Sequence, residues 1–181
     1  PGIYDALGYV ENLNAAVGIS EVLYRFKLYD ENNVLIAERD GRTFIGSNQS
    51  WAIFEGGLKT GERIPKRVFL EFEDGYKWTK INPGFDKIAI SVTNKDLSNA
   101  STSPRLEAVV TNNSLTDLKG VEVAAIVRDV DDNALAVSKT VIDRLSKQSS
   151  ADVFFTWLKP FGGDVARIEV IPRVNPFSAG I

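Results

Sequence analysis

Apolar and polar residues of this chain alternate with a period of two, which is the pattern of β-strands. In the stretch VLYRFKLY, the side chains of Val22, Tyr24, Phe26 and Leu28 share one parity and are all apolar. The positions between them, which end with Tyr29, are mixed in character. Such alternation, rich in aromatic and β-branched residues, predicts a strand with one face in a core. Tyr29 is therefore expected to point outward.

Short runs of the same kind recur along the whole chain. They are NVLIAERD, SWAIFEGG, RVFLEFE, KIAISVTN, RLEAVVTN, VEVAAIVRD, ALAVSKTV, ADVFFTW and VARIEVIPRV. Each run is closed by Gly, Pro, Asn, Asp or Ser, and no window carries a helical stripe of ten or more residues. Many short strands at this spacing predict an all-β chain built as a sandwich or barrel. In ADVFFTW, Phe155 and Trp157 share the inward parity and are expected in the core.

The chain also resembles itself at a distance of about 100 residues. Asn12 matches Asn112, 100 positions away, and Asp30 matches Asp129, 99 positions away. Further matches are Gln49 and Ser50 with Gln148 and Ser149, and LEF at 70–72 with IEV at 168–170. The same alignment places Val22, Tyr24, Phe26 and Leu28 on Val121, Val123, Ala125 and Val127. Ordered matches with a slowly drifting offset predict two copies of one domain.

The repeat sets the expected domain boundaries. The first domain is expected at residues 1–82, a linker at 83–86, the second domain at 87–175 and a tail at 176–181, because Pro and Gly interrupt the strand pattern in INPGFD. In the second copy, the strands KIAISVTN and RLEAVVTN precede the part that matches the start of the first. The first domain is therefore expected to be clipped at its N-terminal edge, with the natural chain extending further in that direction.

One motif resembles a known family. The segment FKLYD, residues 26–30, matches the signature of the FxLYD family of bacterial extracytoplasmic domains, and the VEN before it and LYDENNVLIAE around it fit the same family. The resemblance covers residues 8–56, and in residues 108–155 the segment IVRDVDDNALA keeps the Asp and the turn. It implies two tandem immunoglobulin-like antiparallel β-sandwich domains, placed outside the cytoplasm at the surface or envelope of a bacterium. The family brings no catalytic residues with it.

Composition narrows the chemistry further. The 181 residues carry a net charge of −3 with acids and bases interspersed, and the isoelectric point is about 5.1, which argues against nucleic-acid binding. The chain has no histidine, cysteine or methionine, so most catalytic constellations, all disulfides and most zinc sites are excluded. No G-x-S-x-G elbow, Gly-rich phosphate loop or S-x-x-K motif is present. We therefore expect no enzyme activity and no cofactor.

Membrane attachment is expected only through a segment outside this chain. No run of residues approaches the roughly 18 apolar positions of a transmembrane helix.

Asp30 lies where the first strand ends and its turn begins. An Asp at this position commonly accepts hydrogen bonds from backbone amides of the turn. The alternative is a cation site in which the oxygens of the DENN segment bind calcium.

The matching DVDDN segment tests the calcium alternative. Asp129, Asp131 and Asn133 have the spacing of the first three ligands of an EF-hand loop. However, Ala134 replaces the glycine that the sharp turn of such a loop needs, and Thr140 replaces its bidentate Glu. The pattern favours a hairpin turn and no metal site.

Outward aromatic residues are the candidate contacts. In the repeat alignment Ala52 and Phe54 face inward, so Trp51 and Ile53 are expected to point out. Exposed aromatic surface can stack on a sugar or become buried in a partner. The alternative is packing at the junction between the two domains, which also applies to Trp78 near the linker. Together with Tyr29, these residues are the predicted partner or ligand contacts.

The sequence thus favours a non-catalytic spacer, scaffold or protein-interaction module that contacts a protein partner or other domains of a longer chain. Two other functions remain open. The first is a glycan- or peptide-binding module that uses the outward aromatics of the first domain. The second is β-augmentation, in which a partner strand pairs with an unpaired edge at the N-terminal side of that domain.

Overall fold

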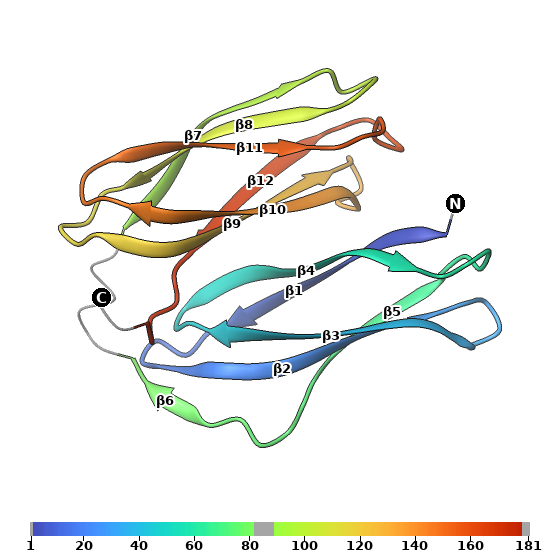
Figure 1. Ribbon diagram of the computed structural model, residues 1–181, viewed down its shortest axis with the longest axis horizontal. Coiled ribbons are helices and arrows are strands. Elements are labelled where there is room, and N and C mark those ends of the chain that lie inside the picture. The colour runs from blue at the N-terminus through green and yellow to red at the C-terminus, as the bar shows by residue number, and fades with distance from the viewer. Residues whose placement is uncertain (1, 82–88, 179–181) are drawn as a thin grey trace. The chain divides into compact units, whose positions relative to one another are not determined.

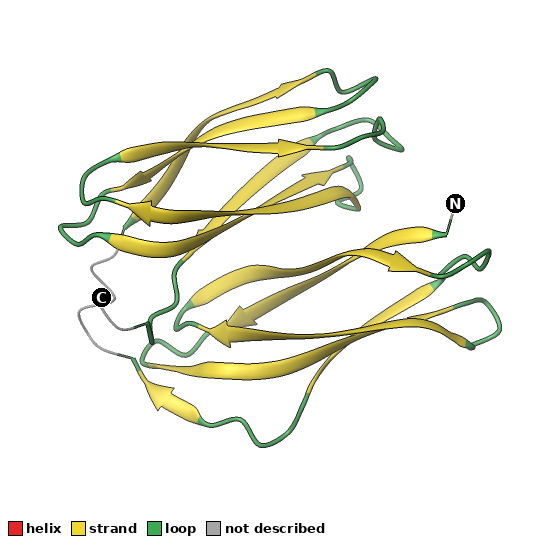
Figure 2. Cartoon of the chain, viewed as in Figure 1, coloured by secondary structure: helices red, strands yellow, loops and turns green. Residues whose placement is uncertain are grey.

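A computed structural model describes residues 2–81 and 89–178 of the chain. The prediction of an all-β chain is confirmed: the described residues form antiparallel sheets and contain no helix (Figures 1 and 2). The chain divides into two compact units, Pro1–Ile81 and Asn82–Ile181. The predicted linker at 83–86 and the last residues of the predicted tail, 179–181, lie outside the described residues.

The first unit holds two sheets. Its strands are β1 (Ile3–Asn12), β2 (Val17–Tyr29), β3 (Leu35–Ile45), β4 (Gln49–Lys59), β5 (Arg67–Phe72) and β6 (Trp78–Lys80). One sheet pairs β1 with β4, and the other has the order β3-β2-β5, with β6 paired to the start of β2. The sequence pattern did not predict β6, because three residues are too short to show a period.

The second unit also holds two sheets. Its strands are β7 (Ile90–Ser98), β8 (Arg105–Asn112), β9 (Leu118–Arg128), β10 (Ala134–Leu145), β11 (Ser150–Thr156) and β12 (Arg167–Arg173). The sheets have the orders β11-β8-β7 and β10-β9-β12.

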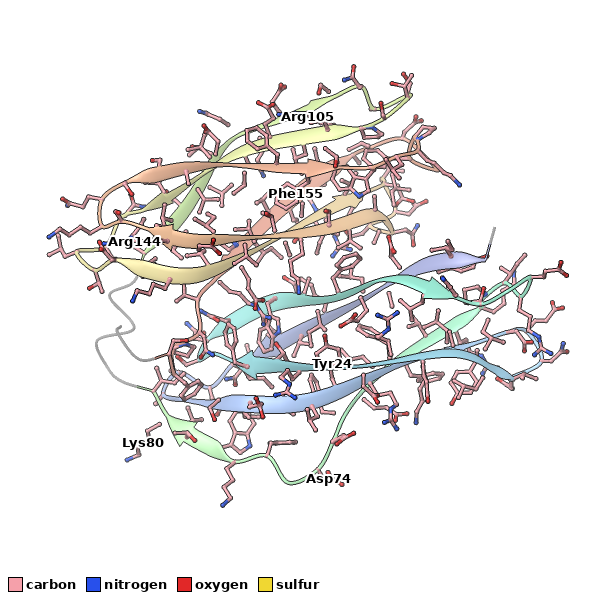
Figure 3. The ribbon with its side chains drawn as sticks, in the orientation of Figure 1. Tyr24, Asp74, Lys80, Arg105, Arg144 and Phe155 are labelled. Atoms are coloured by element: carbon pink, nitrogen blue, oxygen red, sulfur yellow. The ribbon has the colours of Figure 1, made fainter. Side chains whose placement is uncertain are left out.

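The predicted inward face of β2 is confirmed. Val22, Tyr24, Phe26 and Leu28 are all buried and belong to one apolar cluster with residues of β1, β3 and β4. The core of the first unit therefore lies between its two sheets. Figure 3 draws the side chains of both units and labels Tyr24 in the first and Phe155 in the second.

The corresponding face of β9 is buried as well. Val121, Val123, Ala125 and Val127 are fully buried, as predicted. Phe155 on β11 is buried as expected, but Trp157 is only half-buried. Trp157 follows the end of β11, where its indole nitrogen donates to the carbonyl of Val137 on β10.

Strand pairing corrects the alignment of the two units beyond β3. The relevant pairs are Val22 with Thr43 and Ile19 with Ile45 in the first unit, and Val121 with Ile142 and Leu118 with Leu145 in the second. Between these pairs, β2 has two residues and β3 has one, whereas β9 and β10 have two each. The offset between corresponding positions therefore returns from 99 to 100, and the match of Gln49 with Gln148 is wrong by one residue. A slip of one residue exchanges the two faces of a strand.

The match of LEF with IEV is wrong by two residues. Leu70 pairs with Phe26, whereas Val170 pairs with Ala125, so Leu70 corresponds to Val170 rather than to Ile168. A slip of two residues preserves parity, so this error does not exchange the two faces of either strand.

Candidate functional site

Two of the predicted contact residues lie in the core of the first unit. Trp51 is 1% exposed and Ile53 is 3% exposed, and both belong to the buried cluster between the sheets. The prediction that they point outward is wrong. Its cause is the one-residue shift along β3: Trp51 corresponds to Ala151 and Ile53 to Val153, both of which lie on the inward parity of β11. Neither side chain is available to a ligand at the surface.

The other two predicted contact residues are accessible but lie apart. Trp78 on β6 is 51% exposed, and its ring meets that of Tyr76 edge to face, with the ring centres 6.3 Å apart. Tyr29 at the end of β2 is half-buried and meets the exposed ring of Phe69 on β5 at 5.6 Å. The four residues therefore do not form one surface.

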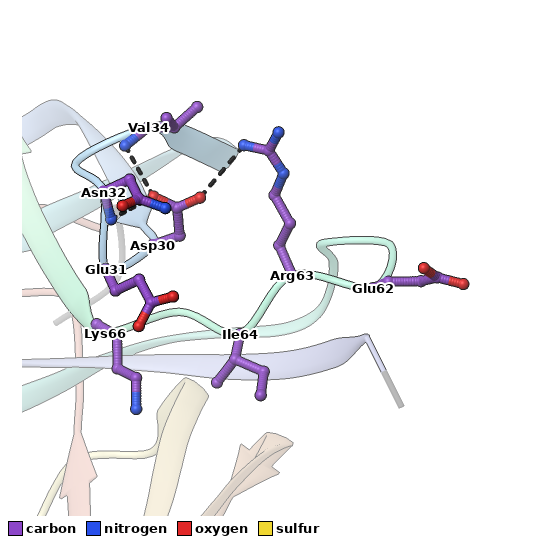
Figure 4. Close-up of a pocket in the computed structure, with 8 residues that line it drawn as sticks. All are labelled: Asp30, Glu31, Asn32, Val34, Glu62, Arg63, Ile64 and Lys66. Atoms are coloured by element: carbon purple, nitrogen blue, oxygen red, sulfur yellow. Dashed lines mark hydrogen bonds and ion pairs between the residues drawn. The ribbon is translucent and has the colours of Figure 1, made fainter.

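A hollow of the first unit lies beside the turn between β2 and β3 (Figure 4). Its volume is about 510 Å³, and it is bounded by that turn and by the loop between β4 and β5. The lining residues are Asp30, Glu31, Asn32, Val34, Glu62, Arg63, Ile64 and Lys66. Three acidic and two basic side chains line it, so the hollow has no strong charge of one sign.

The carboxylate of Asp30 is largely committed to its own turn. One oxygen accepts the backbone N–H groups of Asn32 at 3.0 Å and Val34 at 2.9 Å. The other oxygen accepts the guanidinium of Arg63 at 3.2 Å, as the dashed lines of Figure 4 show. Asn33 adopts a positive φ of 62°, which closes the turn. The predicted turn role of Asp30 matches these contacts, and Asp30 itself is buried.

Arg63 is a partner of Asp30 that the sequence did not indicate. It lies 33 positions from Asp30, on a loop with no period of its own. No local motif signals such a pair, and only the pairing of β5 with β2 brings the loop to the turn.

The turn after β9 repeats this arrangement. One carboxylate oxygen of Asp129 accepts the N–H groups of Asp131 at 2.9 Å and Asn133 at 2.8 Å, and the other accepts the side-chain amide of Asn133. Asp132 has a positive φ of 66°. The amide of Asn133 and the backbone N–H groups lower the pKa of Asp129, because they stabilise the carboxylate form.

These contacts bear on the calcium alternative. The oxygens of Asp30 and Asp129 accept hydrogen bonds, whereas a calcium site needs six to eight oxygens directed at one point. Across residues 2–81 and 89–178, no group of three or more acidic side chains is arranged to hold a metal ion. The geometry favours turn stabilisation at both positions.

In each unit a buried asparagine lies at the end of a strand and holds the loop that follows it. These residues are Asn12 at the end of β1 and Asn112 at the end of β8. The side-chain amide of Asn12 donates to the carbonyls of Val17 and Gly46, and its oxygen accepts the backbone N–H of Asn14. In this way the end of β1 is tied to the turns on both sides of it.

Asn112 ties the end of β8 to the neighbouring turns of the second unit in the same way. Its amide donates to the carbonyls of Thr116, Leu145 and Ser146, and its oxygen accepts the N–H and hydroxyl of Ser114. The side chain is fully buried. A buried amide with all of its groups bonded is a structural element rather than a reactive one.

The outer face of β2 carries ion pairs. Arg25 pairs with Asp40 on β3, and Lys27 pairs with Glu71 on β5 at 2.6 Å. The hydrogen bond from Arg25 lowers the pKa of Asp40. Exposed cross-strand pairs of this kind contribute little each, so we assign them to register and solvation.

In comparisons with known proteins, the chain matches no family model and no curated protein sequence. The part of the chain that the structure describes contains no helix long and apolar enough to cross a membrane.

Proposed function

We propose that the protein is a non-catalytic module of a bacterial surface or envelope protein, located outside the cytoplasm and acting as a spacer, scaffold or protein-interaction element. In this proposal the two units are tandem immunoglobulin-like β-sandwich domains. The resemblance of FKLYD to the FxLYD signature supports the location and the domain type.

One observation carries the non-catalytic part of the proposal. Four polar side chains that are buried or form turns stand out in the two units, and most of their hydrogen bonds are to backbone groups: Asn12, Asp30, Asn112 and Asp129. A catalytic side chain must keep a lone pair or proton for a substrate. Side chains whose polar groups are already bonded within the fold instead favour a mechanical role.

The location can be tested on intact cells of the source organism. Antibodies against this chain are applied before and after permeabilisation, with a cytoplasmic protein as the control for intact membranes. We expect labelling of intact cells. Labelling only after permeabilisation would place the chain inside the cell and refute the proposed location.

A second candidate function is glycan or peptide binding at exposed aromatics. Tyr76 and Trp78 are both substantially exposed, and Tyr76 lines a hollow of about 190 Å³ together with residues 21–23 and 73–75. Aromatic rings beside a shallow polar hollow are suited to stacking on a sugar. A glycan array with the intact chain and with Trp78→Ala tests this function. Signals that survive the substitution, or the absence of any signal, would exclude this surface.

A further inference from the structure

Two Asp–Gly pairs occur in the chain, Asp40–Gly41 and Asp74–Gly75, and the fold holds them in opposite ways. Such a pair is reactive because the backbone nitrogen of the glycine can attack the carboxyl carbon of the aspartate before it. The attack forms a five-membered succinimide ring, and glycine hinders it least because it has no Cβ. The reactivity of each pair in the folded chain therefore depends on whether its backbone can bend into this ring.

The pair Asp40–Gly41 lies inside β3 and is held extended. Asp40 is opposite Arg25 of β2, and Gly41 is opposite Tyr24. The carboxylate of Asp40 also accepts hydrogen bonds from two guanidinium nitrogens of Arg25. Ring closure needs a large rotation of the aspartate ψ away from its extended value, and this rotation would break the pairing with β2. The strand thus protects this pair.

The pair Asp74–Gly75 lies in the loop between β5 and β6, where Figure 3 labels Asp74. Both residues are exposed, and the turn gives Gly75 a positive φ of 95°. A Cβ atom at Gly75 would meet no atom within 4 Å, so the space around its nitrogen is open. Within the two described ranges, no group bonds to the carboxylate of Asp74 or accepts the N–H of Gly75. Neither reacting group is therefore held away from the other.

We propose that Asp74–Gly75 is a site of spontaneous backbone isomerisation in the folded protein, and that Asp40–Gly41 is protected from it. The nitrogen of Gly75 bonds to Cγ of the protonated Asp74 carboxyl. The hydroxyl on Cγ and the proton on the nitrogen leave together as one water molecule. One water molecule then opens the ring at either carbonyl, so that the sum of the two steps consumes nothing.

The position of ring opening decides the product. Opening at Cγ restores aspartate. Opening at the backbone carbonyl of Asp74 breaks the original peptide bond and gives isoaspartate, in which the main chain runs through Cβ and Cγ. The former backbone carbonyl then becomes a free carboxylate, and the main chain is one carbon longer.

Isomerisation changes the surface to which Asp74 belongs. The loop is anchored to β2 at both ends, because the N–H of Glu73 donates to the carbonyl of Leu23 at 2.9 Å and β6 pairs with residues 17–19. The extra carbon must be accommodated between these anchors, where Asp74, Gly75 and Tyr76 line the hollow of about 190 Å³. Aged chains therefore differ from new chains at this surface. This inference goes beyond the proposed function and does not depend on it.

The test follows both pairs in one sample of the 181-residue chain. The folded protein is incubated warm at mildly acidic pH, above the range in which the fold is expected to lose stability. A parallel sample is unfolded in guanidinium chloride. Cleavage after lysine then separates residues 28–59, which hold Asp40, from residues 67–77, which hold Asp74. Electron-transfer fragmentation distinguishes isoaspartate from aspartate, although the two have equal mass.

We expect both pairs of the unfolded sample to accumulate isoaspartate at similar rates. In the folded sample, Asp74 should stay within about threefold of that rate, because an exposed loop opens at little cost. Asp40 should slow about tenfold or more, because its strand must open first. The variant Asp74→Glu keeps the charge but would need a larger ring, and it is expected to remove the modification from residues 67–77.

A matched pair of variants tests the same contrast with a faster reaction. Asp74→Asn and Asp40→Asn each create an Asn–Gly pair, whose amide loses ammonia on ring closure. In the folded protein, we expect Asp74→Asn to deamidate about tenfold or more faster than Asp40→Asn, and in guanidinium chloride at similar rates. The gain in mass on deamidation measures both.

Two results would overturn the proposal. The first is folding that slows Asp74 as much as Asp40 relative to the unfolded chain. The second is equal deamidation of Asp74→Asn and Asp40→Asn in the folded protein. Neither result bears on the labelling of intact cells, so the proposed location and spacer role stand or fall separately.

Discussion

At the scale of single residues, a buried amide can be more important for stability than a charged side chain at the surface. Asn112 binds three carbonyl oxygens that would otherwise be buried beside an apolar core. Leaving buried carbonyl groups unsatisfied costs about 1–3 kcal/mol each when no water replaces the lost donor. By comparison, exposed ion pairs such as that of Lys27 with Glu71 contribute about 0–1 kcal/mol.

We expect Asn112→Ala to lower the free energy of unfolding of the second unit by about 2–4 kcal/mol. The neighbouring Asn113 provides the control, since its side chain is exposed and its amide donates to the hydroxyl of Ser91 at the surface. Asn113→Ala should change stability by less than about 0.5 kcal/mol. Urea unfolding followed by circular dichroism measures both. Equal effects of the two substitutions would contradict the structural role of Asn112.

Trp51, which is buried, and Trp78, which is exposed, give a second matched pair of substitutions. Trp51→Ala empties a large volume in the core of the first unit and should cost about 3–5 kcal/mol. Trp78→Ala, at an exposed position, should cost about 1 kcal/mol or less. Thermal unfolding of the two variants tests the difference. A Trp51→Ala variant as stable as the parent protein would show that Trp51 does not belong to the core.

These residues also show what could be read from the sequence. The inward face of β2 and the turn roles of Asp30 and Asp129 depend on local patterns, and parity and turn chemistry were sufficient to predict them. The orientation of Trp51 depends on the count of residues along β3, and the partner of Asp30 depends on a loop 33 residues away. Periodicity carries no information about either.

At the scale of elements, a local irregularity decides which residues of a whole strand are buried. The missing residue in β3 lies opposite residues 20 and 21 of β2. An alignment of the two units that ignores this shift assigns the inward and outward faces of β4 the wrong way round. With the shift, Trp51 rather than Ala52 belongs to the central cluster. Sequence similarity between the units is too weak after β3 to reveal such a gap, whereas backbone pairing reveals it directly.

Gly18 lies just before this irregularity, and its substitution tests how closely β2 and β3 pack. A Cβ atom at Gly18 would lie 2.1 Å from the carbonyl oxygen of Ile45, which belongs to the backbone of β3 and cannot turn aside. We expect Gly18→Ala to destabilise the first unit by about 1–3 kcal/mol through overpacking.

Gly162 is the matched control for Gly18. No atom lies within 4 Å of a Cβ at Gly162, and its backbone is not in the left-handed region. Gly162→Ala should therefore leave stability unchanged or raise it by a few tenths of a kcal/mol. Denaturant midpoints of the two variants measure the contrast. A Gly18→Ala protein as stable as Gly162→Ala would show that β2 and β3 are not packed this closely.

At the scale of the whole molecule, the response to pH follows from which groups titrate. The chain has no histidine, so few protons are exchanged between about pH 6 and pH 8. Among residues 2–81 and 89–178, three carboxylates have lowered pKa values in the folded chain: Asp40 through Arg25, Asp117 through the backbone N–H of Lys147, and Asp129 through Asn133. In the unfolded chain these carboxylates return to their ordinary pKa of about 3.8.

A lowered folded pKa stabilises the fold above the unfolded value, and this stabilisation is lost as pH falls through the folded value. We therefore expect the unfolding temperature to be flat between about pH 6 and pH 8 and to fall below about pH 4. Asp129→Asn should make the acidic part of the profile shallower, because one of the three groups is removed. Circular dichroism melts across pH 2.5–8 measure both. A change between pH 6 and pH 8 as large as that below pH 4 would contradict the expectation.

The pairing of β1 has a final consequence for how the chain folds as it is synthesised. β8 finds a partner in β7, which ends seven positions before it, so the two strands can form a hairpin at once. The pairing of β1 with β4 forms only after β4 has been synthesised, because Asn12 pairs with Gln49 and Ile3 with Lys59. Pairing over a long loop is slow, since the entropy of closing the loop is lost before the contacts form. The unit that is synthesised first is therefore expected to be the slower of the two to complete its fold.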